Sequence, residues 1–164
     1  MRTFLAGAML RFMQTLSIIP FTGPIWRLLP RSLANQPKAP AHAPFGRFHY
    51  SGQIAAYGSL TAEGARVAIQ RYLADGVDRM LVPMWLDAQH VADIRGIAAA
   101  SIVWQDISQN EQPSPTWSFS DTARKLGADA MLYSSRSRPD LSHVVVFRPE
   151  LLTYVGPTAI FVHP

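Results

Sequence analysis

Short apolar and β-branched runs, separated by polar connections rich in proline, glycine and serine, recur along this chain of 164 residues. The clearest lie in its last third, as AMLYSS at 130–135, HVVVFRPE at 143–150 and AIFVHP at 159–164. Runs of this length and composition are typical of short strands. Strands and helices do not alternate regularly enough for a doubly wound parallel sheet. The pattern therefore predicts an α+β domain with a small mixed β-sheet core and flanking helices.

The middle of the chain supplies the clearest helix and the longest strand. The segment 59–76, SLTAEGARVAIQRYLADG, has Ser59 or Thr61 as an N-cap and Gly76 as its end. Helical spacing predicts a buried stripe on this helix. Its members are Ala65, Ala68, Ile69, Tyr72 and Leu73. The segment 78–87, DRMLVPMWLD, predicts a buried strand whose Pro83 implies a sheet edge or a bulge.

Three further segments predict smaller elements. The segment 118–129, SFSDTARKLGAD, predicts a short helix that starts near Ser120 or Asp121 and ends at Gly127. The segment GRFHYS at 46–51 is expected to be a short strand, with Phe48 and Tyr50 on one face. The segment ASIVWQDI at 100–107 fits a strand or a helix equally well.

Composition narrows the classes of function. The chain has no cysteine, which excludes disulfides, thiolate nucleophiles and cysteine-based zinc sites. Its five histidines show no metal-binding spacing, so we expect no metal site. Six Lys and Arg residues and no acid precede Glu63, but they are scattered singly. Direct binding to nucleic acid is therefore not expected, because no nucleic-acid-binding motif accompanies them.

The first 24 residues form an apolar stretch that Arg11 interrupts after eight residues. No small-residue cleavage site follows at the distance a signal peptide requires. The uncharged run 12–26 is too short to span a bilayer and contains two prolines. We expect residues 1–24 to be an ancillary N-terminal segment, residues 25–164 to be the main domain, and the protein to be cytoplasmic without stable membrane association.

Candidate chemistry is scattered over several short pieces. GRFHYSG at 46–52 places an arginine, a histidine and a tyrosine between two glycines, and LYSSRSRPDL at 132–141 adds serines and arginines. The chain lacks the glycine-rich dinucleotide and phosphate-binding loops and the GxSxG nucleophile motif.

These pieces together resemble the RES domain family. The similarity rests on GRFH and SGQ, on YGSLTAEGA, on LVP, LDA and DIR, and on GAD followed by MLYSSRSRPDLSHVVVF, in this order. It runs from about Ile25 to about Phe147. RES domains are toxins of bacterial type II toxin–antitoxin pairs. The resemblance implies a fold like that of ADP-ribosyltransferase toxins, NAD as the substrate and an Xre-like protein as the antitoxin.

The resemblance also implies roles for individual residues. Arg47, His49, Glu63 and Ser135 are the catalytic candidates. Breaking the nicotinamide–ribose bond requires stabilisation of a cationic ribose, a clamp for the pyrophosphate and a stacking surface. NAD contacts are expected from Arg27, Arg47, Tyr50, Tyr57, Ser134 and Arg136. Each of these residues also has a plain structural explanation, as a surface charge, a turn residue, a core ring or a strand end.

The acidic residue is the point at which the chain departs from the family. The family places a glutamate several residues into the helix, and that position is Ala68 here. Glu63 lies one turn earlier and either takes over this role or only interacts with the helix dipole. In the second case the chain is a catalytically impaired module that binds NAD or an antitoxin. The sequence leaves open phosphorolysis, hydrolysis and ADP-ribosylation of a protein target.

Overall fold

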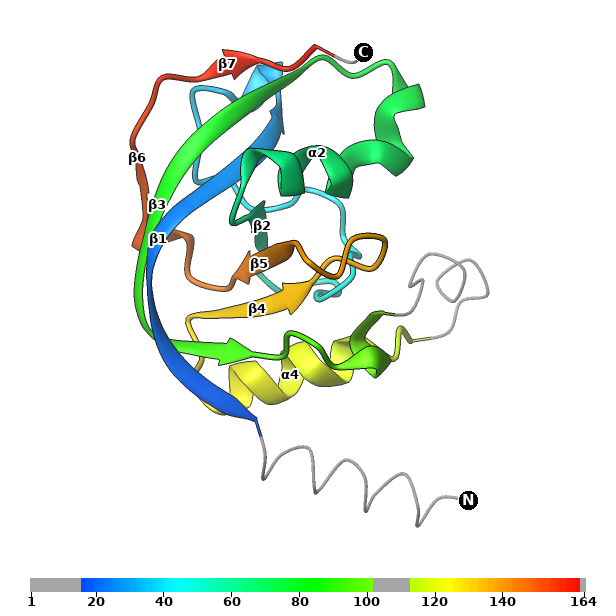
Figure 1. Ribbon diagram of the computed structural model, residues 1–164, viewed down its shortest axis with the longest axis vertical. Coiled ribbons are helices and arrows are strands. Elements are labelled where there is room, and N and C mark those ends of the chain that lie inside the picture. Colours follow the sequence, from blue (N-terminus) through cyan, green and yellow to red (C-terminus); the bar gives the residue numbers. More distant parts are fainter. Residues whose placement is uncertain (1–15, 102–112, 163–164) are drawn as a thin grey trace.

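The computed structural model describes residues 16–101 and 113–162 of the chain (Figure 1). Over these residues the chain forms seven strands and two α-helices around one sheet. The strands are β1 (Ser17–Pro30), β2 (Ala56–Ser59), β3 (Arg79–Asp93), β4 (Ala130–Ser134), β5 (Ser142–Val146), β6 (Leu152–Tyr154) and β7 (Ala159–Ile160). The helices are α2 (Ala62–Ile69) and α4 (Trp117–Lys125), and short 3-10 turns follow several of these elements.

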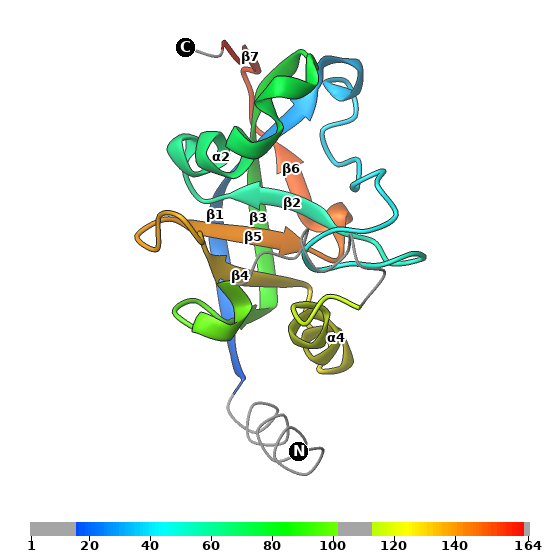
Figure 2. The same ribbon diagram turned by 90° about the vertical axis from the view of Figure 1, so that its right-hand side faces the viewer.

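Strands β1 and β3 are long, curved and antiparallel, and they pair from Ser17 opposite Asp93 to Pro30 opposite Arg79. Further pairings join β1 to β2, β2 to β5, β5 to β4 and β4 back to β3, so these five strands close into a ring. Figure 2 shows β2, β5 and β4 stacked between α2 and α4. The predicted boundary after Pro24 falls inside β1, because residues 17–24 pair with β3.

The predicted strand 78–87 is confirmed, and β3 continues to Asp93. Pro83 was expected at an edge or a bulge, yet it lies inside the strand opposite Trp26 of β1. On the other side of β3, pairing with β6 begins at Met84 and pairing with β7 ends at Leu81. The missing N–H of Pro83 falls in this gap, and its carbonyl still accepts a hydrogen bond from the Val155 N–H at 3.2 Å.

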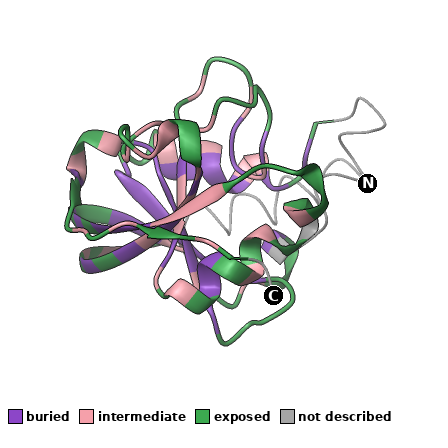
Figure 3. Ribbon diagram, turned by 90° about the horizontal axis from the view of Figure 1, so that it is seen from above, coloured by how far each residue is buried: buried purple, intermediate pink, exposed green. Residues whose placement is uncertain are grey.

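The two faces of the β2–β5–β4 unit are buried differently. One face carries small and branched apolar side chains that pack against β1 and β3 in the main core. These residues are Ala56, Ala130, Leu132, Val144 and Val146. Figure 3 shows the sheet coloured by burial, with buried residues along these strands. The opposite face carries Tyr57, Met131, Tyr133 and Val145, which pack toward α4 and Phe48. Because side chains alternate along each strand, the face toward β1 and β3 is apolar, and the opposite face also carries polar side chains.

Helix α2 begins as predicted, because Thr61 Oγ1 accepts the Gly64 N–H at 2.9 Å. The helix is shorter than expected and passes into a 3-10 turn at Gln70–Asp75, which Gly76 ends with a φ of 71°. The predicted buried stripe is only partly confirmed. Ala65 is buried, but Ala68 and Tyr72 are exposed. The helix face that should have entered the core borders an open cavity instead.

Other predicted elements differ in extent. Helix α4 begins at Trp117, earlier than expected, and Gly127 follows it with a φ of 77°. The expected strand at 46–51 is reduced to one bridge between Gly46 and His49, and the strand at 159–164 is limited to Ala159–Ile160. The undecided segment at 100–107 forms a 3-10 turn up to Ser101, and its remainder lies outside the described residues. The sheet-rich core with flanking helices confirms the α+β class.

Candidate functional site

A cavity of about 630 Å³ lies beside α2 and the outer face of β2, β5 and β4. Five of the nine predicted site residues line it, although they come from three separate parts of the chain. These five are Arg47, His49, Tyr57, Ser135 and Arg136. Arg27, Tyr50, Glu63 and Ser134 do not line it. The cavity lining within the described residues includes two arginines and no carboxylate, which gives it a positive charge.

Arg47 is the more buried of the two cavity arginines. Its guanidinium carbon lies 4.9 Å from the ring centroid of Tyr133 and 5.1 Å from that of Phe48. One Nη donates to the Ala100 carbonyl, whereas Nε is buried without a partner among the described residues. Burial lowers the pKa of Arg47, which nonetheless remains a cation at neutral pH. Arg47 is thus held by two rings and retains hydrogen-bonding capacity for an anion.

His49 and Tyr57 form a buried hydrogen-bonded pair in the cavity wall. His49 Nε2 lies 2.8 Å from the Ala43 carbonyl, which can only accept, so Nε2 donates. Nδ1 then accepts the Tyr57 hydroxyl at 2.7 Å, and the same hydroxyl accepts the Phe48 N–H at 3.0 Å. Burial raises the pKa of Tyr57 above its usual range. Both ring nitrogens of His49 are occupied, which leaves this residue poorly suited to shuttle protons.

Gly46 makes this arrangement possible. A Cβ at this position would lie 2.3 Å from the His49 ring and 2.9 Å from the Tyr57 hydroxyl. Both distances are shorter than any van der Waals contact. The glycine that opens GRFHYSG therefore provides the space in which His49 and Tyr57 meet.

The loop after β4 carries Ser135 and Arg136 to the cavity. Ser135 is 3% exposed, and its Oγ accepts the Arg138 N–H at 3.3 Å. Arg136 is exposed, and its positive charge contributes to the lowered pKa of Arg47. The two guanidinium groups are therefore close enough to interact, and both line the cavity. Ser134 points elsewhere, because its Oγ accepts the Gly96 N–H at 3.0 Å.

Arg27, a predicted NAD contact, serves the fold. It is 4% exposed and donates to three backbone carbonyls, those of Pro37, Ala39 and Tyr57, at 2.6–2.9 Å. Burial lowers its pKa to about 10. These bonds attach the proline-rich loop to β1 and β2. The Arg27 side chain does not line the cavity.

Tyr50, also a predicted NAD contact, faces α4. Its hydroxyl donates to Asp121 at 3.1 Å, and its ring lies 5.1 Å from that of Trp117. The chain direction reverses between Gly46 and His49, so the neighbours His49 and Tyr50 face different sides. Of the three candidate residues in this turn, Arg47 and His49 therefore line the cavity and Tyr50 does not.

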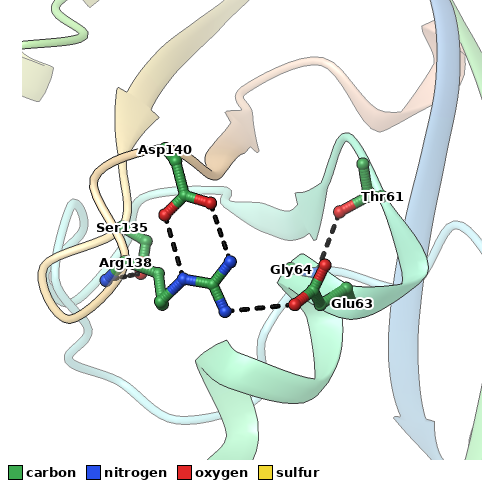
Figure 4. Close-up of polar contacts among 6 residues, drawn as sticks. All are labelled: Thr61, Glu63, Gly64, Ser135, Arg138 and Asp140. Carbon is green, nitrogen blue, oxygen red and sulfur yellow. Dashed lines mark hydrogen bonds and ion pairs between the residues drawn. The ribbon is translucent and has the colours of Figure 1, made fainter.

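Glu63 lies on the surface beside the loop that follows β4. Its carboxylate accepts the Arg138 Nη1 at 3.1 Å, and its side chain is 61% exposed (Figure 4). Arg138 also binds Asp140 through two bonds of 2.7 and 2.9 Å, and these partners raise its pKa. Ala68 lines the cavity instead, so the acid of this helix and the cavity are separated.

The cavity lining also includes residues that the sequence did not single out as site residues, among them Ser59, Tyr133 and His143. Ser59 and Tyr133 lie two residues from the predicted Tyr57 and Ser135, so strand alternation could have identified them. His143 reaches the cavity because β5 places it opposite both Ser59 and Tyr133, a register that the sequence does not reveal. Burial, and then the charge of Arg47, lower the pKa of His143 to about 4.

No group of three or more His, Asp or Glu side chains within 16–101 and 113–162 is arranged to hold a metal ion. No helix in the same residues is both long and apolar enough to cross a membrane.

Comparison with known proteins places this geometry in a family. The family model for the RES domain matches residues 24–161. The fold is similar to a chain of the crystal structure of the M. tuberculosis MbcT–MbcA toxin–antitoxin complex, with a TM-score of 0.65 and 14% sequence identity over 94% of this chain and 92% of that chain. A comparison with curated proteins found no match. The family match spans most of the chain and includes every residue that lines the cavity, and the protein therefore belongs to the RES domain family.

Proposed function

We propose that this protein is the toxin of a type II toxin–antitoxin system and that its cavity binds NAD and cleaves the nicotinamide–ribose bond. The observation that carries the proposal is the gathering of Arg47, Arg136, Tyr57 and Ser135 in one cavity of about 630 Å³. Guanidinium groups suit the two phosphates of a dinucleotide, and aromatic rings suit its bases. The family match and the toxin–antitoxin title of the structural neighbour support the same assignment.

In the proposed reaction the bond between ribose C1′ and the nicotinamide nitrogen breaks, and nicotinamide leaves with the bonding electron pair. C1′ then forms a bond to an oxygen of phosphate, to water, which loses a proton, or to a nucleophile of a target protein. The contribution of this chain is to bind and orient. Arg47 and Arg136 hold the pyrophosphate, Tyr57 and Tyr133 provide ring surfaces, and the Ser135 hydroxyl lies among them to contact the ribose.

A second candidate function is an NAD-binding or antitoxin-binding module without catalysis. The observation that favours it is the lining itself, in which Ala68 is present and Glu63 is absent. A carboxylate would stabilise the positive charge that develops on the ribose, and the described lining offers none. Glu63 is also held by Arg138.

The partner proposed for this protein is an Xre-like antitoxin. An antitoxin would neutralise the protein by covering the cavity, whose exposed Arg136 and Tyr72 are accessible from outside. An acidic or C-terminal carboxylate group of the partner would be attracted to the same arginines as NAD.

The test is nicotinamide release from NAD by the purified protein, with and without phosphate and with and without a bacterial lysate. Dependence on phosphate indicates phosphorolysis, and transfer of label to a lysate protein indicates ADP-ribosylation. Binding of NAD without release identifies the second candidate. Absence of NAD binding would refute the proposed reaction and the NAD-binding form of the second candidate, and would leave only a module that binds an antitoxin.

Arg47→Ala provides the matched test of the site. We expect it to weaken NAD binding at least tenfold, because the proposed charge-assisted contact to the phosphates is lost. Arg66→Ala, on the exposed side of α2, is the control and should bind NAD as the wild type does. Unchanged NAD affinity in a folded Arg47→Ala protein would refute the assignment of this cavity.

A further inference from the structure

Ser59 and His143 form a buried polar pair to which the function proposed above assigns no role. Ser59 Oγ lies 2.6 Å from His143 Nδ1. Both side chains line the cavity, although Ser59 is only 1% and His143 only 4% exposed. They sit opposite each other on β2 and β5, and Tyr133 of β4 continues the row. The pair is therefore fixed by the sheet and not by a mobile loop.

The hydrogen bond between Ser59 and His143 determines which ring nitrogen of the neutral His143 carries the hydrogen. Within the described residues, the Ser59 hydroxyl has no acceptor other than His143 Nδ1. If Nδ1 carried the ring hydrogen, the hydroxyl hydrogen of Ser59 would be buried without an acceptor, which is costly. Ser59 therefore donates to Nδ1, and Nε2 carries the hydrogen of the neutral ring.

The Nε2 of His143 is available to a ligand. It has no hydrogen-bond partner in residues 16–101 and 113–162, and it is not sealed from solvent as Arg47 Nε is. His49, the histidine singled out in the sequence, uses both nitrogens within the protein. Because burial keeps the His143 ring neutral at neutral pH, its free N–H is an uncharged donor.

Charged and uncharged donors occupy neighbouring places in the cavity wall. The Tyr133 ring lies 4.9 Å from the Arg47 guanidinium carbon and 5.4 Å from the His143 ring centroid. Phosphate oxygens bind preferentially to the cation, since a charge-assisted hydrogen bond is the stronger one. A neutral N–H held in a fixed direction suits a carbonyl oxygen, which carries no charge.

We propose that His143 donates its Nε2 hydrogen to an uncharged carbonyl oxygen of the bound ligand, in NAD the carboxamide oxygen of the nicotinamide ring, and that Ser59 is a positioning residue that orients this donor. This inference rests on the proposed function, because it requires NAD in this cavity. His143 would then select the nicotinamide half of the ligand while the arginines select its phosphates.

The test measures the affinities of a non-cleavable carba analogue of NAD and of ADP-ribose, which lacks nicotinamide, by calorimetry. We expect His143→Leu to weaken the NAD analogue about tenfold and to leave ADP-ribose within twofold, since one hydrogen bond is lost. His143→Gln retains an amide N–H near the same place and should recover most of the affinity. His90→Leu, at a histidine outside the cavity with a 68% exposed side chain, is the control.

Equal weakening of both ligands would overturn the inference, as would no change in either while the wild type binds both. In these two outcomes the proposed NAD site stands. A wild type that binds neither ligand refutes the proposed function itself and the inference with it.

Nitrogen NMR of the histidine rings gives a readout that needs no ligand. We expect the wild-type His143 to show the Nε2–H tautomer and Ser59→Ala to admit the Nδ1–H tautomer. A wild-type Nδ1–H tautomer would overturn the positioning role of Ser59, whether or not NAD binds.

Discussion

Side chains of the same residue type serve different purposes in this protein. The difference follows from how deeply each side chain is buried and from which groups it hydrogen-bonds. Arg27 is buried and Arg47 is partly buried. Arg27 donates its hydrogen bonds to backbone carbonyls, whereas Arg47 lines the cavity. His49 and His143 differ in the same way, since only His143 has a free ring nitrogen. The type of a residue therefore says less about its role than the number of its donors that the protein itself uses.

The three backbone contacts of Arg27 predict a large effect on stability. Arg27→Ala should lower the free energy of unfolding by roughly 3 kcal/mol, because it leaves buried carbonyls without donors. Denaturant unfolding followed by circular dichroism measures this change. Arg31→Ala, at an exposed arginine nearby, is the control and should change the value by less than about 0.5 kcal/mol. Equal effects of the two substitutions would contradict the structural role.

The lowered pKa of His143 predicts a pH dependence of stability. The folded protein holds the His143 pKa at about 4, whereas the unfolded chain binds the proton near pH 6.5. Between these values the unfolded state carries more protons, so stability falls as the pH drops from about 6.5 to 4. The loss should reach roughly 3 kcal/mol at most.

His143→Gln isolates this contribution, because carboxyl groups also titrate in the same range. The difference in unfolding free energy between wild type and variant should shrink as the pH falls from 7 to 4. A difference that stays constant with pH would mean that the buried ring does not resist protonation.

At the level of elements, an ion pair joins α2 to the loop between β4 and β5. Arg138 binds Glu63 of α2 on one side and Asp140 on the other, while its N–H binds Ser135 (Figure 4). The loop that carries Ser135 and Arg136 is thereby attached to the helix that forms another wall of the cavity. Such exposed ion pairs contribute little to overall stability, but they limit where the loop can lie.

Glu63→Gln separates a structural from a catalytic glutamate. We expect the variant to lose less than about 1 kcal/mol of stability and to keep NAD affinity within about twofold, because Glu63 lies outside the cavity. Glu150→Gln, which removes a comparable surface pair with Arg148, is the control. Nicotinamide release that is present in the wild type and abolished by Glu63→Gln alone would show that the acid reaches the substrate.

On the scale of the whole molecule, the ring of strands depends on residues that precede the RES domain match. The match begins at residue 24, but β1 begins at Ser17 and pairs with β3 on both sides of an irregularity at Pro20. Ile19 and Phe21 are partly buried against the main core. The β1–β3 pair thus extends the domain beyond the residues that the family model matches.

Deleting residues 1–24 should therefore destabilise the protein relative to a chain that begins at Leu16. We expect a decrease of about 2 kcal/mol or more in unfolding free energy, equivalent to roughly 4–8 °C in Tm, because paired strand and two partly buried apolar side chains are removed. Thermal unfolding of the two truncated chains measures it directly. Identical midpoints would show that Ser17–Pro24 adds nothing to the fold.

The sequence by itself determined the α+β class, the cap of α2 at Thr61 and the cores of β3, β4 and β5, because these depend on local composition and spacing. The family motifs also singled out five residues that line the cavity, namely Arg47, His49, Tyr57, Ser135 and Arg136. The tertiary structure alone decided that Arg27 and Tyr50 bind other groups of the protein, that Glu63 lies outside the cavity and that His143 lies in it. Strand register and loop path control these outcomes, and both result from contacts between residues far apart in the chain.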